Sequence, residues 1–361
     1  MARTRSAALL PAKTTAAIVL GTGARARVNT TEKVKKVVKK QRKAAVADTE
    51  PTSEGTPALE AGPQDAFTAV PSASARKTKP HIESFFAHIA TPPDLRLPTE
   101  FLEFHTPEFI RGVEHVLSVD ASLYPAVVHD NFRSFERVAD APRDGASLIN
   151  HYWFSLITSV LSQQISGHAA KAIRTRFELL FADIPTPEAT LKLLSETLKA
   201  VGLSTMKLKY VLHISETFAR GDSALSQPEF YQNASTQELI KELTQLKGVG
   251  EWSARMFCLF TLKNMDVFAH DDLGVARGIA RYFEVRPEIL AETKQGVHVD
   301  EQRKAGLRKK TKFAVTGSKR DWTPLHDEYV KFLAQKLLPY RLVFMLVMWR
   351  LSATNTEVLQ K

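Results

Sequence analysis

Cysteine is almost absent from this chain of 361 residues, since Cys258 is the single example. One cysteine excludes an internal disulfide and is typical of proteins in reducing compartments. It also excludes a four-cysteine iron–sulfur cluster. The histidines lack the paired spacing of a zinc site, so the sequence predicts no zinc and no cofactor. This holds for His151, His168, His213 and His270.

Long hydrophobic runs are lacking as well. The run from Leu342 to Trp349 holds eight apolar residues between Arg341 and Arg350. A membrane-spanning helix needs about 20 apolar residues, so this run predicts a buried helix and we expect no membrane segment. The alternating pattern of strands is scarce too, which favours an all-α fold.

Acidic residues are missing from the start of the chain. None precedes Glu32, and seven basic residues lie between Lys33 and Lys43. The composition then turns to Pro, Thr, Ser, Ala, Glu and Gly, which supply too little apolar surface to offset ordering entropy. Residues 1–92 are therefore predicted to be a disordered basic tail. The basic run indicates nuclear import or DNA contact, or is only a solvated tail.

This tail also bears on the compartment. We expect the nucleus, because the basic run suits import and the chain carries a formal net charge of +10. The first 31 residues contain Arg and no acid. That pattern is shared with mitochondrial transit peptides, so a mitochondrial form is the alternative.

A Gly-x-Gly turn stands between two helical patterns. Ser235 and Glu238 form a capping box that begins the first helix. Gly248 and Gly250 permit positive φ and close backbone approach, while Val249 anchors the turn in the core. The first N–H groups of the next helix lack intrahelical partners, which makes a phosphate site that reads no sequence. An ordinary helix–helix turn is the alternative interpretation.

Two consecutive acids, Asp271 and Asp272, precede a periodic apolar run that begins at Leu273. An Asp in this position caps a helix, which accounts for one carboxylate but not for two. A capping Asp is held rigidly by its helix, so one residue can both cap and serve catalysis.

Four separated motifs then occur in one order along the chain. They are LSQQISGHAAKAI (161–173), VGLSTMKLKYV (201–211), LKGVGEWSARMF with HDDLG (246–274), and PYRLVFMLVMWRLSATNTE (339–357). With these motifs the chain resembles the helix-hairpin-helix (HhH-GPD) DNA glycosylases, and most closely the eukaryotic 3-methyladenine, or alkylated-purine, DNA glycosylases. The resemblance runs from about Ser147 to Glu357 and implies a two-lobed helical fold with DNA between the lobes.

The resemblance also implies a domain organisation. Residues 146–357 would form the glycosylase domain, with the hairpin at 236–261 and a basic loop at 300–322. The leading helices of residues 93–145 would join the C-terminal helices in the second lobe. Eight basic residues and no acid lie between residues 302 and 320. That stretch is either a disordered surface loop or an arm that contacts phosphates without reading sequence.

Site residues follow from the resemblance by position. The second acid, Asp272, matches the essential carboxylate of the family, and Asp271 is counted with the base pocket. Trp252 and Tyr340 match aromatic positions of the damaged-base pocket. Relatives that also cut the DNA strand carry a lysine nucleophile at the position of Trp252. An indole cannot take that role, so a monofunctional enzyme that leaves an abasic site is implied.

DNA contacts are implied in the same way. Ser166 matches the position from which relatives insert a side chain into the gap left by the extruded nucleotide. Gln163 and Gln164 either pin neighbouring backbone or contact the flipped nucleotide, because buried amides need partners. The predicted DNA-binding set is completed by the hairpin residues Gly248, Val249 and Gly250. Hairpin carbonyls of the family hold a monovalent cation, which would place one at Thr244, Leu246 and Val249.

The chemistry agrees with these residue types. A base must leave the duplex before it can be cut. Breaking its bond to C1′ builds positive charge on the sugar, and Asp272 either stabilises that charge or activates water. Purines alkylated on a ring nitrogen are already cationic, so aromatic faces favour them and no general acid is required.

The sequence therefore predicts a monomeric, monofunctional DNA glycosylase that acts on double-stranded DNA containing alkylated bases and starts base excision repair. A non-catalytic DNA-binding scaffold and a glycosylase for a different lesion are the alternatives. The sequence does not choose among 3-methyladenine, 7-methylguanine, ethenoadenine and hypoxanthine.

Overall fold

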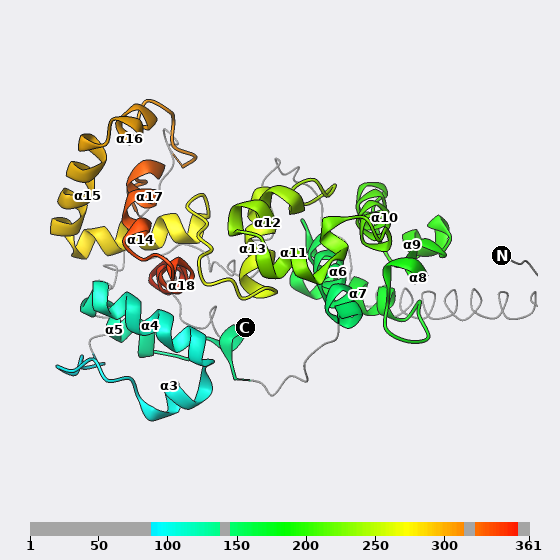
Figure 1. Cartoon of the computed structure of the whole chain (residues 1–361), viewed down its shortest axis with the longest axis horizontal. Coiled ribbons are helices and arrows are strands. Elements are labelled where there is room, and N and C mark those ends of the chain that lie inside the picture. Colours follow the sequence, from blue (N-terminus) through cyan, green and yellow to red (C-terminus); the bar gives the residue numbers. More distant parts are fainter. Residues whose placement is uncertain (1–87, 138–144, 314–321, 353–361) are drawn as a thin grey trace, which may run out of the picture. The chain divides into compact units, whose positions relative to one another are not determined.

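The computed structural model describes residues 88–137, 145–313 and 322–352 (Figure 1). The chain divides into two units, Met1–Thr56 and Pro57–Lys361, and every described residue belongs to the second. Most of the predicted tail of residues 1–92 thus lies outside the described residues. Extended pairing among the described residues is limited to one isolated bridge between His105 and Glu136. The predicted all-α fold is confirmed.

The helices form three successive groups. The first holds α3 (Thr99–Phe104), α4 (Pro107–Val119) and α5 (Tyr124–Val128), with the 3-10 turns η1 (Ala121–Leu123) and η2 (Arg133–Phe135). The second holds α6 (Gly145–Ser162), α7 (Gly167–Glu178), α8 (Pro187–Leu191), α9 (Ser195–Ala200), α10 (Thr205–Ala219), η3 (Ala224–Ser226), α11 (Pro228–Asn233), α12 (Thr236–Leu243) and α13 (Glu251–Phe260). The third holds α14 (Leu273–Val285), α15 (Pro287–Val299), α16 (Glu301–Gly306), α17 (Asp327–Gln335) and α18 (Arg341–Ser352).

The second group packs around α10. This helix lies against α6 and α8, α6 contacts α7 and α13, and α12 packs on α13. Trp153 of α6 is completely buried, and its indole N–H donates to Ser215 Oγ of α10 at 3.1 Å. A buried indole needs such an acceptor. This bond and the surrounding apolar contacts fix α6 on α10.

The third group is built on the contact between α14 and α18. Residues Leu342 to Met348 are all buried, which confirms the predicted buried helix. The two backbones touch at Gly278, because a Cβ added there would lie 1.9 Å from the carbonyl oxygen of Met348. Among the described residues, no helix is both long enough and apolar enough to cross a bilayer.

Two polar anchors attach the first group to the third. The buried Arg350 of α18 donates to the carbonyl oxygens of Ala126 at 3.0 Å and Val127 at 2.6 Å, near the end of α5. Asp120, which ends α4, accepts from Tyr282 Oη at 2.5 Å and from Arg286 Nη1 at 2.7 Å. Hydrogen bonds to charged groups are stronger than neutral ones, so α4 and α5 are held against α14 and α18.

His105 is a buried polar residue within the first group, with none of its surface exposed. Its Nδ1 lies 2.8 Å from the carbonyl oxygen of Phe101, and its Nε2 lies 2.8 Å from the backbone N–H of Phe132. Because a carbonyl accepts and an N–H donates, the neutral ring must carry its proton on Nδ1. The pKa of His105 is lowered to about 4, mainly because the ring is buried. The bond to Phe101 raises the pKa, and the charge of Arg350 lowers it.

Candidate active site

The carboxylate of Asp272 is held by three N–H donors. Asp272 caps α14, and its Oδ1 accepts the backbone N–H of Val275 at 3.0 Å. Oδ1 also accepts the indole N–H of Trp349 at 2.8 Å, while Oδ2 accepts that of Trp252 at 2.9 Å. The helix cap predicted for one acid of the pair is thereby confirmed at Asp272. An ionised carboxylate offers about four acceptor sites, so one site remains, on Oδ2.

Three separate elements bring these groups together. Trp252 stands in the first turn of α13, directly after the hairpin, and Asp272 precedes α14. Trp349 comes from α18, which packs along α14. The site therefore depends on the contact between α14 and α18 as much as on the hairpin.

Asp271 has different partners from its neighbour. Its Oδ1 accepts from Arg255 Nη1 at 2.8 Å, and its Oδ2 lies 3.4 Å from Lys312 Nζ. Burial would raise the pKa of Asp271, but the charges of Arg255, Lys312 and His270 outweigh it and hold the pKa below the usual value. The two adjacent acids thus occupy distinct environments: Asp271 is paired with cations and Asp272 with indoles.

Trp349 is the site residue that the sequence prediction missed. Its ring stacks on that of Phe260, with centroids 6.2 Å apart and planes 16° from parallel. Phe260 is 44% exposed, which is unusual for so large an apolar side chain. A signal for Trp349 was available, because an indole N–H in an otherwise apolar helix needs an acceptor.

Tyr340 lies in a different setting from Trp252, the other aromatic residue predicted for the pocket. Its ring centroid is 5.5 Å from that of His115, and a Cβ added to Gly112 would lie 2.9 Å from Tyr340 Cδ1. Both neighbours belong to α4. The place of Tyr340 in a base pocket remains a prediction, whereas Trp252 directly contacts Asp272.

The hairpin has the predicted capping box, with reciprocal bonds between Ser235 and Glu238. Gly248 has a φ of +87°, and a Cβ there would lie 2.4 Å from the Tyr210 ring, so both backbone and packing require glycine. Gly250 does not use positive φ, since its φ is −88°. A Cβ at Gly250 would meet nothing within 4 Å, which leaves space for another molecule. Val249 is 6% exposed, as expected of an anchor.

Gly250 also begins α13 without a side-chain cap, so the first N–H groups of α13 have no side-chain acceptor. These donors are the predicted phosphate-binding groups. Phosphate binding itself stays a prediction.

Two side chains outside the hairpin bond to its backbone, Gln163 just after α6 and His213 of α10. Gln163 Nε2 donates to the carbonyl oxygen of Gly248 at 2.8 Å, so Gln163 pins neighbouring backbone, one of the two roles considered. His213 Nδ1 accepts the backbone N–H of Lys247 at 3.2 Å. Burial and the charge of Lys247 lower the pKa of His213, which suits a neutral ring that accepts.

Gln164 and Ser166 lie on the surface just before α7. Gln164 has a φ of +57°, an uncommon conformation for a residue with a side chain. Ser166 Oγ accepts the N–H of Ala169 at 3.3 Å and caps α7. A capping hydroxyl is already engaged, and insertion of Ser166 into DNA stays a prediction, as does DNA contact by Gln164.

The predicted cation site consists of hairpin carbonyls. Leu246 O accepts one bond, from the N–H of Val249 at 3.0 Å, and keeps its second lone pair. Thr244 ends α12, where carbonyls lack intrahelical partners. Oxygen ligands of this kind fit a hard cation, which would add positive charge next to the hairpin. Its presence remains a prediction.

The described residues thus place a hairpin that opens α13 beside a carboxylate held by three N–H donors and beside a pair of stacked aromatic rings. The model of the HhH-GPD superfamily base excision DNA repair protein matches residues 157–298. The DNA-3-methyladenine glycosylase of Saccharomyces cerevisiae is 32% identical over 282 residues, which cover 75% of this chain and 88% of the yeast protein. The chain belongs to the HhH-GPD superfamily of base excision DNA repair proteins, and the resemblance seen in its motifs is confirmed.

Two further comparisons involve Schizosaccharomyces pombe, one with a sequence and one with a solved structure. DNA-3-methyladenine glycosylase 1 is 36% identical over 136 residues, which cover 37% of this chain and 58% of that protein. The solved structure of the 3-methyladenine DNA glycosylase Mag1 in complex with abasic DNA is 24% identical. The structural match covers 66% of this chain and 95% of the Mag1 chain, with a TM-score of 0.43.

Proposed function

We propose that this protein is a monofunctional DNA glycosylase that removes alkylated purines such as 3-methyladenine from duplex DNA. Membership in a superfamily of base excision repair proteins supports the proposal, as does the similarity to the DNA-3-methyladenine glycosylases of two yeasts. The observation that carries it is the Asp272 carboxylate fixed between the indoles of Trp252 and Trp349.

The bonds around Asp272 give it a specific chemical role. All three donors are N–H groups that point at the carboxylate oxygens, so they hold the carboxylate in one orientation. As the bond from C1′ to the base breaks, positive charge grows on the sugar. A carboxylate that is already oriented stabilises this charge without reorganising. The remaining acceptor site on Oδ2 would face the sugar cation or accept a hydrogen bond from the attacking water.

Aromatic side chains near Asp272 support the proposed preference for alkylated bases. The indoles of Trp252 and Trp349 contact Asp272, and the ring of Phe260 stacks on Trp349. Aromatic faces attract cations, and an alkylated purine carries a positive charge. Such a base is also a good leaving group, so the reaction needs no general acid.

The identity of Trp252 bears on whether the DNA strand is cut after the base has been released. Strand cleavage by relatives requires an amine that attacks the sugar and forms a Schiff base. An indole whose N–H is engaged by Asp272 cannot do this. The product would be an intact strand with an abasic site.

We further propose that the protein works as a monomer in the nucleus, with a mitochondrial form as the alternative. The basic run from Lys33 to Lys43 supports nuclear import or DNA contact. Expression of the chain fused to a fluorescent protein, followed by imaging, tests the compartment. Exclusion from the nucleus would contradict the proposal.

The proposed activity is tested by incubating the protein with duplexes that each carry one defined lesion. Released bases are then measured by chromatography. Release of 3-methyladenine or 7-methylguanine is the expected result. Binding of the damaged duplexes without release of any base would instead favour the non-catalytic DNA-binding alternative.

A further inference from the structure

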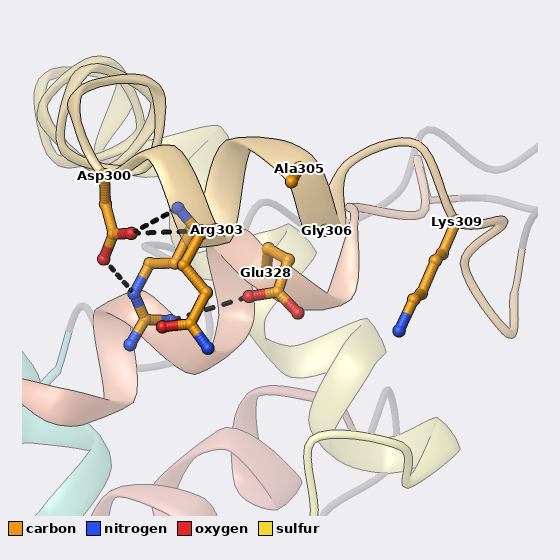
Figure 2. A pocket seen from close by; sticks show the side chains of 7 residues that line it. Asp300, Arg303, Ala305, Gly306, Lys309 and Glu328 are labelled. Carbon is orange, nitrogen blue, oxygen red and sulfur yellow. Dashed lines mark hydrogen bonds and ion pairs between the residues drawn. The ribbon is translucent and has the colours of Figure 1, made fainter.

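Several described residues of the predicted basic loop, 300–322, contact the rest of the protein. They begin with a helix, α16, and not with a loop. In the pocket shown in Figure 2, Arg303 of α16 bonds to Asp300 at 3.2 Å and lies 3.6 Å from Glu328 of α17. These charged groups already pair with one another. The ion pair between Arg303 and Glu328 joins α16 to α17.

The segment after α16 is attached to the start of α17. His326 accepts the N–H of Glu328 through Nδ1, so its Nε2 carries the proton and donates to the carbonyl oxygen of Lys309 at 2.8 Å. Thr311 Oγ1 donates to Asp327 Oδ1 at 2.7 Å. A freely moving loop would make no such specific bonds. In the structure, two points of this segment, Lys309 and Thr311, are bonded to residues at the start of α17.

The same segment then reaches the acid pair. Lys312 Nζ donates to the carbonyl oxygen of Asp271 at 2.9 Å and lies 3.4 Å from its carboxylate. Phe313 meets Trp322 edge to face, with centroids 6.2 Å apart. Phe313 and Trp322 pack with Ala276 and Ala280 of α14, the helix that Asp272 caps. Both flanks of residues 314–321 are thus fixed to the helix that carries the candidate carboxylate.

The anchored segment presents excess positive charge. Arg308, Lys309 and Lys310 are exposed, and none forms a salt bridge with another residue in the described ranges. Figure 2 shows Lys309 without a partner among the residues drawn. The Lys312 side chain is 54% exposed, and its partner Asp271 is already paired with Arg255 at 2.8 Å. A protein surface rich in unpaired Lys and Arg suits a polyanion.

We propose that Arg308, Lys309, Lys310 and Lys312, here termed the basic ledge, bind backbone phosphates of duplex DNA as a second contact beyond the hairpin. The proposal rests on the proposed function, because an enzyme that extrudes a nucleotide must hold the flanking duplex. Phosphate contacts fix the position of a protein on DNA. Because the ledge is tied to α14 and α17, it holds the strand at a fixed distance from Asp272, which a mobile arm could not do.

Lys312 is the positioning residue of the basic ledge. Its ammonium has three N–H donors, and Asp271 takes at most two of them. The third can bind a phosphate while the first still holds the backbone one residue before Asp272. Lys312 would therefore connect phosphate binding to the placement of the candidate carboxylate.

Binding measurements with the full-length protein test the ledge. Two duplexes of one sequence are used, one undamaged and one with a stable abasic-site analogue, across a range of potassium chloride concentrations. In the ledge variant, Arg308, Lys309 and Lys310 are each changed to Gln. The slope of log affinity against log salt should become shallower by about 0.9 per lost contact, on both duplexes.

A matched variant controls for net charge. It carries Lys192→Gln, Lys199→Gln and Lys294→Gln, which are exposed lysines outside the ledge. Its slope should stay close to that of the unaltered protein. The proposal would be overturned if the ledge variant kept the slope of the unaltered protein. It would also be overturned if the slope became shallower by the same amount in the ledge variant and in the control variant.

Lys312→Gln and Lys312→Arg test the positioning role. With Gln, the salt slope should fall and base release in a single turnover should slow by about tenfold, the effect of losing a hydrogen bond of roughly 1.4 kcal/mol. Arg should restore the slope, since it keeps the charge. A slower rate with an unchanged slope would show that Lys312 only supports Asp271, and would refute its phosphate contact.

The unaltered protein separates the two proposals. If it releases no base from any lesion duplex, the proposed function fails. If it releases base normally while every ledge variant keeps the full salt slope, the ledge alone fails. Circular dichroism of each variant checks that the fold is retained.

Discussion

Trp349 donates its indole N–H to Asp272 Oδ1 at 2.8 Å, although 77 residues separate the two in sequence. The same oxygen accepts the backbone N–H of Val275, so one indole and one helix terminus fix a single carboxylate oxygen. The orientation of this group thus follows from the packing of α18 on α14.

Asp272→Asn is expected to lower base release by about 100-fold or more, the scale of losing one preorganised electrostatic group. The amide keeps the shape of the side chain but removes the charge that faces the sugar. Binding to lesion DNA should survive within about tenfold, because phosphate contacts dominate affinity. Single-turnover base release and binding to an abasic-site duplex provide the two measurements. Asp271→Asn should have a smaller effect, and the reverse ranking would move the catalytic role to Asp271.

Trp349→Phe should slow base release by about tenfold to 100-fold, since a hydrogen bond to a charged group contributes about 1.5–3 kcal/mol. The ring face against Phe260 is retained, so the change isolates the N–H. Trp153→Phe is the matched control, because it removes a buried indole bond in a different part of the protein, to Ser215. The control should lose thermal stability but keep its excision rate. Equal rate losses in both variants would refute a specific role for Trp349.

Borohydride should not trap this protein covalently on damaged DNA. The position that carries a nucleophilic lysine in bifunctional relatives is Trp252, and its N–H is bonded to Asp272. The measurement is gel analysis of the protein after reaction with a lesion duplex in the presence of borohydride. A covalent adduct would show that another amine attacks the sugar and would end the monofunctional assignment.

His105 should make the protein less stable in acid. The pKa of the ring is about 4 in the folded protein against a usual 6.5, so between these values the unfolded chain binds more protons. Stability should fall as pH drops from about 6.5 to about 4, by up to about 3 kcal/mol for this residue. Urea unfolding at several pH values measures the effect, and His105→Gln should flatten the dependence. An unchanged slope in that variant would assign the effect to other groups.

Features that depend on near neighbours could be predicted from the sequence. The capping box at Ser235, the glycine at 248 and the Asp272 cap each follow from residues within one helical turn, and the structure contains all three. Alternatives that depend on the packing of distant helices could not be decided. Gln163 had two possible partners, and its bond to Gly248 crosses 85 residues. In the sequence, nothing distinguishes Lys312 from the other seven basic residues of its stretch. Its bond to Asp271, 41 residues away, is visible only in the fold.

The backbone contact at Gly278 has a consequence for the candidate site. The carbonyl of Met348 occupies the space that any side chain at 278 would need, and the next residue along α18 is Trp349. Gly278 therefore sets the distance between α14 and α18. The hydrogen bond from the Trp349 indole to Asp272 forms only at that distance. Even a methyl group there would push α18 outward and carry Trp349 away from Asp272. A substitution at a residue that touches neither substrate nor acid would then mimic the loss of an active-site group.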